Sequence, residues 1–294
     1  MSRLSDTRYA LDKLAWMRKE RIWPNGLRYV WTDAFGLVLL VSLYEALRDE
    51  RYLDEAEWLV AEVNRVLGRP RGIRIGEEPD RDGQYFHYLA MWLYALSVLG
   101  RYRPLYREQG VTLARQIHDP FVVPGRGVIW KMQEDLSGPY PGYGFGALDA
   151  FDGYVSYRLL DEQALAREIG EMYALIKRTA GDLVITQDLG LGMILWLALP
   201  RGGMGQAAYE ALARHARPRE GYFAREPYLP QMCFAFTNYG VSVGLQAADA
   251  MPERVDALNA YFETYRSGDE YDRNAITHVM ACSSHFPGLM LRSL

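Results

Sequence analysis

Four polar residues, each placed at the start of an apolar run, carry the side chains best suited to chemistry: Asp33, Asp149, Asp188 and Asn238. Two carboxyl groups that share a cleft do not both ionise at low cost, so one keeps its proton while a hydrogen-bonded neighbour stays charged. Such a pair supplies the proton donor and the base needed for glycosidic-bond hydrolysis or for hydration of an unsaturated sugar. We therefore expect the three aspartates to be catalytic and Asn238 to bind substrate. Helix capping is the alternative explanation for each of them.

A second polar cluster, residues 80–88, precedes another apolar run and contains a histidine. Asp82 and Gln84 are placed to cap the following helix or to bind substrate, and His87 falls on its first turns. His278 lies at a similar depth in the last apolar run. Two facing histidines would suit proton transfer beside a sugar carbonyl, although a lone histidine is more often structural. No His-x-His or His-Glu-x-x-His spacing is present, so we expect neither a metal nor another cofactor.

Aromatic residues near these polar stretches suit the binding of sugar rings. The chain has 21 Tyr and 7 Trp. The segment 138–146 is too rich in Gly and Pro to be helical, so its aromatic rings lie in a loop. The rings expected to bind substrate are Trp31, Tyr85, Trp130 and Tyr143. The alternative is that these rings fill the edge of the core.

The elements that must position these residues are helical hairpins. In each hairpin an apolar helix is followed by an amphipathic one; within 52–67, for example, the apolar residues recur with helical period. The predicted pairs are 37–47 with 52–67, 83–99 with 105–117, 147–160 with 163–178, 189–199 with 205–216, and 237–248 with 252–265. The apolar helix 274–291 and the amphipathic helix 5–19 complete a sixth hairpin through the two ends of the chain.

This pattern predicts an all-α chain, a single (α/α)6 toroid domain over residues 1–294 with six apolar helices inside six amphipathic ones. An open helical bundle or an α-solenoid is the alternative. We favour the closed ring because the two terminal helices are complementary. Segments 71–76, 125–132 and 221–225 read as extended connections before inner helices, and they would gather at one rim.

The arrangement resembles the (α/α)6 barrel of the six-hairpin glycosidase-like superfamily. Tyr29-Val-Trp-Thr-Asp-Ala-Phe35, followed by Asp49-Glu-Arg-Tyr-Leu-Asp-Glu-Ala56, is similar to the first hairpin of unsaturated glucuronyl hydrolases. This resemblance implies a glycoside hydrolase-like enzyme with Asp33 as a catalytic carboxylate and Asp149 or Asp188 as its partner. The N-acylglucosamine 2-epimerase-like enzymes share the barrel. Their resemblance implies a sugar epimerase or isomerase that uses His87 and His278.

Composition narrows the class of partner. The formal net charge is −4 with no block of like charge, which gives no reason to expect nucleic acid or an anionic membrane. The apolar run 35–47 is interrupted by Ser42 and Glu45 and is too short to span a bilayer. The polar start and the two cysteines without metal-ligand spacing predict a cytoplasmic protein. We expect a small-molecule or oligosaccharide substrate and leave the oligomeric state open. A terpene cyclase-like enzyme and a non-catalytic binding barrel remain alternatives.

Overall fold

The computed structural model describes residues 3–179, 192, 234–249 and 251–291. The backbone groups into two compact units. The continuous unit is described over 27–179, and the discontinuous unit over 3–26, 192, 234–249 and 251–291. The single-domain organisation stays a prediction. The predicted hairpin 189–199 with 205–216, the segment 221–225 and Asp188 lie outside the described residues, apart from position 192.

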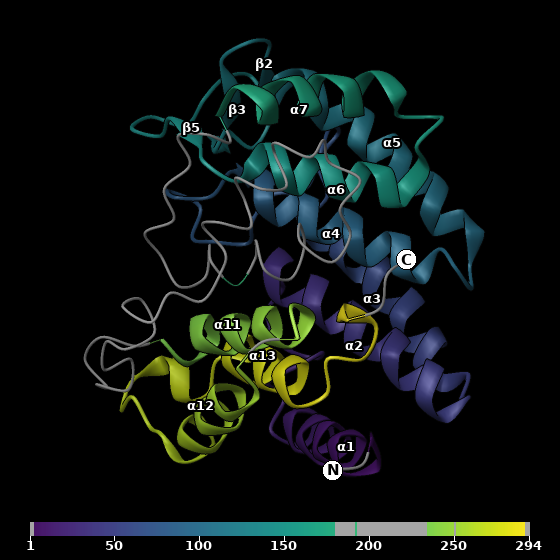
Figure 1. Cartoon of the computed structure of the whole chain (residues 1–294), viewed down its shortest axis with the longest axis vertical. Coiled ribbons are helices and arrows are strands. Elements are labelled where there is room, and N and C mark those ends of the chain that lie inside the picture. Colours follow the sequence, from purple (N-terminus) through teal and green to yellow (C-terminus); the bar gives the residue numbers. More distant parts are fainter. Residues whose placement is uncertain (1–2, 180–191, 193–233, 250, 292–294) are drawn as a thin grey trace. The chain divides into compact units, whose positions relative to one another are not determined.

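The continuous unit consists of three helical hairpins that follow one another in sequence (Figure 1). The hairpins are α2 (Val30–Leu47) with α3 (Arg51–Leu67), α4 (Phe86–Leu99) with α5 (Pro104–Phe121), and α6 (Asp149–Asp161) with α7 (Ala166–Thr179). Helix α4 packs against both α2 and α6, while α3, α5 and α7 each pack on their own partner. The predicted order of apolar inner helices and amphipathic outer helices is confirmed for these three hairpins.

Burial in these helices follows the apolar pattern of the sequence. Helix α2 buries every residue from Val30 to Leu43. Helix α3 buries one face only, made of Leu53, Ala56, Leu59, Val60, Val63 and Leu67. Helix α2 is longer than the predicted run and, at 18 residues, is long and apolar enough to cross a membrane, but 78% of it is buried inside the structure. Enclosure of this kind is typical of a core helix.

Two small antiparallel sheets join the loops that precede α4 and α6. Strand β1 (Gln84–Tyr85) pairs with β4 (Lys131–Met132), and β3 (Gly127–Ile129) lies between β2 (Val122–Val123) and β5 (Phe145–Gly146). The extended conformation predicted for 125–132 is confirmed over these strands, whereas 71–76 forms only an isolated bridge between Gly68 and Ile73. Pairing of β1 delays the start of α4 to Phe86. It also ties the loop before α4 to the loop before α6.

The discontinuous unit brings the two ends of the chain together. Helices α11 (Ala235–Ala247) and α12 (Pro252–Thr264) form one hairpin, and α13 (Ala275–His285) packs on α11 and on α1 (Arg3–Lys19) (Figure 1). The predicted pairing of the terminal helices is therefore confirmed. Short 3-10 turns follow at η4 (Glu270–Asp272) and η5 (Gly288–Met290). Helix α13 ends at His285, earlier than predicted, because Phe286 precedes Pro287 and such a residue is disfavoured in a helix.

Candidate active site

The starts of the inner helices α2, α4 and α6 meet around His87. This histidine is the second residue of α4. Its Nδ1 lies 3.9 Å from Oδ1 of Asp149, the first residue of α6. Its ring centroid lies 6.0 Å from that of Trp31, near the start of α2. Packing of α4 between α2 and α6 thus gathers three sequence-predicted site residues from distant parts of the chain.

Asp149 is a buried carboxyl group held in its acid form. Only 4% of the residue is exposed, and Oδ1 makes no hydrogen bond within the described part of the chain. Burial raises the pKa of Asp149 to about 8, while backbone hydrogen bonds from Asp149 itself and from His87 act in the opposite direction. At neutral pH this group therefore carries a proton that it can donate.

A second buried carboxyl group, Asp152, lies one helical turn further along α6. It is 3% exposed, and burial together with the nearby Asp149 raises its pKa well above the ordinary value. Asp152 was not among the site residues predicted from the sequence. The available signal was the spacing of three residues, which puts two side chains on neighbouring positions of a helix surface.

The carboxylate of Asp149 fits beside the chain because residue 146 is glycine. A Cβ atom built on Gly146 would lie 1.6 Å from Asp149 Oδ2. Pairing with Val128 fixes Gly146 within β5. By contrast, a Cβ on Gly144 would meet nothing within 4 Å. Gly146 is thus a close-approach position that sequence reasoning did not single out.

The protonation of His87 is set by Trp130. The indole Nε1 of Trp130 donates a hydrogen bond of 3.1 Å to His87 Nδ1, so the proton of the neutral imidazole is on Nε2. Burial lowers the pKa of His87 to about 3, which keeps the ring neutral across the physiological range. Trp130 is itself 38% exposed and covers this side of the histidine.

Three aromatic rings form a surface next to His87. The centroids of Trp130 and Tyr143 are 5.4 Å apart, and Tyr85 lies 5.8 Å and 6.1 Å from these two rings. The backbone N–H of Phe86, the first residue of α4, donates to the carbonyl of Trp130 at 3.1 Å. This bond links the aromatic surface to the helix that carries His87. Three rings predicted to bind substrate are therefore together.

A buried lysine supports this aromatic surface. Lys131 is 1% exposed, and its Nζ lies 4.7, 4.4 and 5.2 Å from the ring centroids of Tyr85, Tyr140 and Tyr143. The same ammonium group donates to Glu77 Oε2 at 3.2 Å and to the carbonyl of Arg81. Cation–π contacts are strongest when the cation is removed from water. Lys131 therefore holds the tyrosine rings in place.

Asp33 forms a buried ion pair. It is fully buried in the first turn of α2, with Oδ1 3.2 Å from Arg28 Nη1, while Oδ2 accepts from the backbone N–H of Tyr29 at 3.2 Å. Tyr29 is the N-cap residue of α2, which has no side-chain cap. The alternative explanation of Asp33 as the N-cap residue is therefore wrong, although its carboxylate accepts the backbone N–H of that residue. Its carboxylate instead fastens the segment before α2 to the first turn of that helix.

The capping roles expected of other polar residues are also wrong. The N-cap of α4 is Tyr85, without a side-chain bond, because β1 comes between residue 82 and the helix. Asp82 forms an ion pair with Arg74, and Gln84 donates to the carbonyl of Glu134 at 2.7 Å. Both residues are buried and brace loops. Helices α6 and α11 likewise begin after Leu148 and Phe234, without side-chain caps from Asp149 or Asn238.

Two sequence-predicted residues lie in the discontinuous unit. Asn238 is buried in α11 and donates to the carbonyl of Phe234 at 3.0 Å. His278 Nε2 lies 3.0 Å from the carbonyl of Asp272, and its ring meets that of Trp16 edge-on at 4.6 Å. Within the described ranges, no three His, Cys, Asp or Glu side chains are grouped to hold a metal ion.

Comparison with known proteins identifies the fold. No protein-family model and no curated protein matches the sequence. The GH76A α-1,6-mannanase of Salegentibacter sp. HEL1_6 superposes with a TM-score of 0.57 at 11% identity, over 99% of this chain and 100% of that chain. Cellobiose 2-epimerase of Bacillus thermoamylovorans B4167 gives a TM-score of 0.54 at 10% identity, over 88% of each chain. The likeness to these two structures shows that the chain has the (α/α)6 barrel fold.

Proposed function

We propose that this chain is a carbohydrate-active enzyme that hydrolyses glycosidic bonds by acid–base catalysis, with Asp149 as the proton donor. The observation that carries the proposal is a buried carboxylic acid beside a neutral histidine, under a partly exposed aromatic surface. The fold supports it, since a mannanase and a cellobiose epimerase are among the similar solved structures. Fold alone does not determine a reaction, so the site has to carry the argument.

The reaction can be written with the groups at the start of α6. Asp149 gives its proton to the glycosidic oxygen as the bond from that oxygen to the anomeric carbon breaks. Water then adds to the oxocarbenium-like carbon, and the Asp149 carboxylate takes back a proton from that water. Burial raises the energy of a charged Asp149, which keeps the proton on this group at neutral pH until the glycosidic oxygen takes it. We assign Asp33 a positioning role, because Arg28 and Tyr29 already engage its carboxylate.

The aromatic surface indicates the substrate class. The C–H faces of a sugar ring pack on aromatic planes, and Trp130, Tyr85 and Tyr143 offer such planes next to His87. The ammonium group of Lys131 is enclosed and engaged with Glu77. It is thus not available to a uronic acid. We therefore propose neutral sugars as substrates.

Epimerisation is the second candidate, and His87 is the observation that favours it. Its ring lies between Asp149 and Trp130, where a base acting next to a sugar carbonyl would be needed. In that reaction a proton leaves a carbon atom and returns to its opposite face. His87→Asn would then abolish turnover, and the product would be an epimer of unchanged chain length.

The test is turnover of α-1,6-linked manno-oligosaccharides and of cello-oligosaccharides, with products identified by chromatography and NMR. Asp149→Asn should lower kcat by at least about a hundredfold, as expected for loss of a general acid. The control Asp80→Asn, at an exposed position, should not. A second pair of variants tests the position of the Asp149 carboxylate. Gly146→Ala displaces this carboxylate and should lower kcat, whereas Gly144→Ala does not displace it and should leave kcat unchanged.

Hydrolysis that is lost in Asp149→Asn and weakened in Gly146→Ala, but kept in the two control variants, supports the proposal. Undiminished hydrolysis in Asp149→Asn refutes the assigned donor. Formation of an epimer that depends on His87 replaces hydrolysis by the second candidate.

A further inference from the structure

A cavity of about 640 Å³ lies entirely within the discontinuous unit. Its walls come from α1, the starts of α11 and α13, the end of α12, and the loop that contains η4. Pockets for small ligands usually measure about 300–1,000 Å³, so this cavity has room for one or two sugar rings. None of its lining residues belongs to the cluster around His87.

Aromatic rings form much of the cavity wall. Phe234, directly before α11, is 51% exposed, and its ring centroid lies 5.1 Å from that of Tyr271 in η4. Trp16 of α1 and Tyr265 after α12 also line the space. An exposed phenylalanine backed by a tyrosine offers a flat apolar surface that is not otherwise covered in the described structure.

The charged residues of the cavity already have partners. Three acids and three bases line it: Asp12, Glu263, Asp272, Lys13, Arg266 and Arg273.

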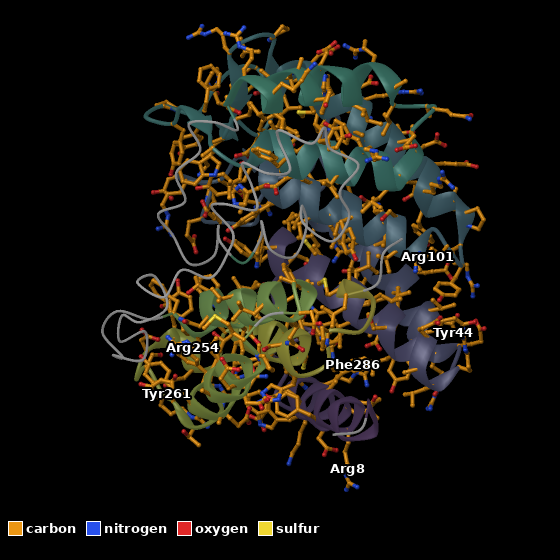
Figure 2. The ribbon with its side chains drawn as sticks, in the orientation of Figure 1. Arg8, Tyr44, Arg101, Arg254, Tyr261 and Phe286 are labelled. Atoms are coloured by element: carbon orange, nitrogen blue, oxygen red, sulfur yellow. The ribbon has the colours of Figure 1, made fainter. Side chains whose placement is uncertain are left out.

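Lys13 pairs with Glu263 at 3.3 Å, and Arg273 pairs with Glu20 at 3.0 Å. On α1, Asp12 lies 3.8 Å from Arg8, whose side chain projects into solvent (Figure 2). Arg266 interacts electrostatically with Asp272. An ionic ligand would have to disrupt one of these pairs, whereas a neutral ligand would not.

His278 adds a neutral polar group to the same wall. The carbonyl of Asp272 can only accept a hydrogen bond, so His278 Nε2 donates to it and Nδ1 is the accepting nitrogen of the ring. Burial lowers the pKa of His278 to about 4, which keeps the ring uncharged at neutral pH. A hydroxyl group can donate to such a nitrogen. The wall thus combines flat apolar rings with uncharged and paired polar groups.

We propose that this cavity is an accessory binding site for a neutral saccharide, with Phe234 and Tyr271 as the surface on which the sugar ring packs. The site goes beyond the proposed function, since it binds sugar without reacting with it and uses residues outside the His87 cluster. The sequence predicts His278 as a substrate-binding residue, or as the partner of His87 in an epimerase, and the proposal here uses the first of these roles.

The proposal is tested by equilibrium dialysis with cellobiose and with α-1,6-mannobiose, in the Asp149→Asn background so that the probes stay intact. Phe234→Ala and Tyr271→Ala should each weaken the binding of one equivalent at least fivefold. The control Leu105→Ala, at an apolar position of α5 that is 57% exposed, should bind as the parent does. Glucuronic acid should bind at least tenfold more weakly than glucose, which is the neutral sugar of the same ring size. Circular dichroism confirms that each variant is folded.

Binding that is unchanged by both aromatic substitutions overturns the proposal, as does equal binding of glucuronic acid or no binding of either neutral probe. The turnover assay separates this outcome from failure of the proposed function. Hydrolysis together with unchanged binding in Phe234→Ala refutes only the proposal of an accessory site. Binding that depends on Phe234 without any turnover removes only the hydrolase.

Discussion

Replacing Asp149 with asparagine should stabilise the protein, and the gain should grow with pH. The pKa of this carboxyl group rises from an ordinary 3.8 to about 8 because it is buried. Between these two values the folded protein holds the proton and the unfolded chain does not, so the free energy of unfolding falls as pH rises. One pKa unit corresponds to about 1.4 kcal/mol, so the loss accumulates to about 4 kcal/mol at pH 7. Asparagine does not titrate and avoids this loss.

A smaller effect opposes the gain. Asp149 Oδ1 is buried without a hydrogen-bond partner among the described residues, so an amide NH2 group placed there would lose its own hydrogen bonds at a cost of about 1–2 kcal/mol. We therefore expect Asp149→Asn to be no more stable than the wild type at pH 4, and more stable by about 2–3 kcal/mol at pH 7. Urea unfolding followed by circular dichroism, at half-unit steps from pH 4 to pH 8, measures the difference. Asp80→Asn controls for the loss of one negative charge.

The slope of the difference against pH is the decisive quantity. A stability difference between wild type and Asp149→Asn that does not change between pH 4 and pH 8 would show that the carboxyl group ionises normally. That result would refute both the raised pKa and the assignment of Asp149 as the acid. A difference in the free energy of unfolding that stays constant with pH would reflect only the cost of burying the unpaired amide group.

Two further predictions follow from the same groups. Turnover should fall as pH rises through about 8, where Asp149 loses its proton. Between pH 5 and 7 turnover should not change with pH, because His87 has a pKa of about 3. A pH profile of kcat that rises through pH 8 would contradict the assignment of Asp149 as the acid. Lys131→Met should lower the free energy of unfolding by about 1–2 kcal/mol, since the cation–π contacts and the bond to Glu77 are lost. The control Arg126→Met should change this free energy little, because Arg126 is exposed above a single ring. Urea midpoints of the two variants test this, and a more stable Lys131→Met would show that burial of the ammonium group costs more than its contacts return.

Most of the helical framework could be predicted from the sequence, because the spacing of apolar residues determines which face of each helix is buried. Helix α3 shows this best, since the six residues with helical period are the ones that are buried. The pairing of α1 with α13 also followed from composition, because one was amphipathic and the other apolar. The early end of α13 at His285 is a local effect of Pro287 that the apolar pattern did not reveal.

The partners of the polar residues could not be predicted, since they depend on loops whose course no periodicity fixes. Asp33 was read as a cap or a catalyst, yet Arg28, only five positions earlier, turns back to pair with it. Asp82 and Gln84 were expected to cap the following helix or to bind substrate, but the pairing of β1 with β4 puts Gln84 in a strand and separates Asp82 from the helix. The contact of His87 with Asp149 was predictable only as a general convergence of helix starts. Its distance and its electrostatics required the structure.

The hydrogen bond from Trp130 to His87 has a consequence for how one scaffold could serve two reactions. While the indole donates to Nδ1, that nitrogen cannot accept another proton, and Nε2 already carries one. The histidine is thus a latent base, which becomes active only when the tryptophan swings away. Trp130 also belongs to the aromatic surface proposed to receive the sugar. A substitution that removed the indole N–H would free Nδ1 to accept a proton beside Asp149, so Trp130 determines whether the proposed site holds an acid alone or an acid and a base.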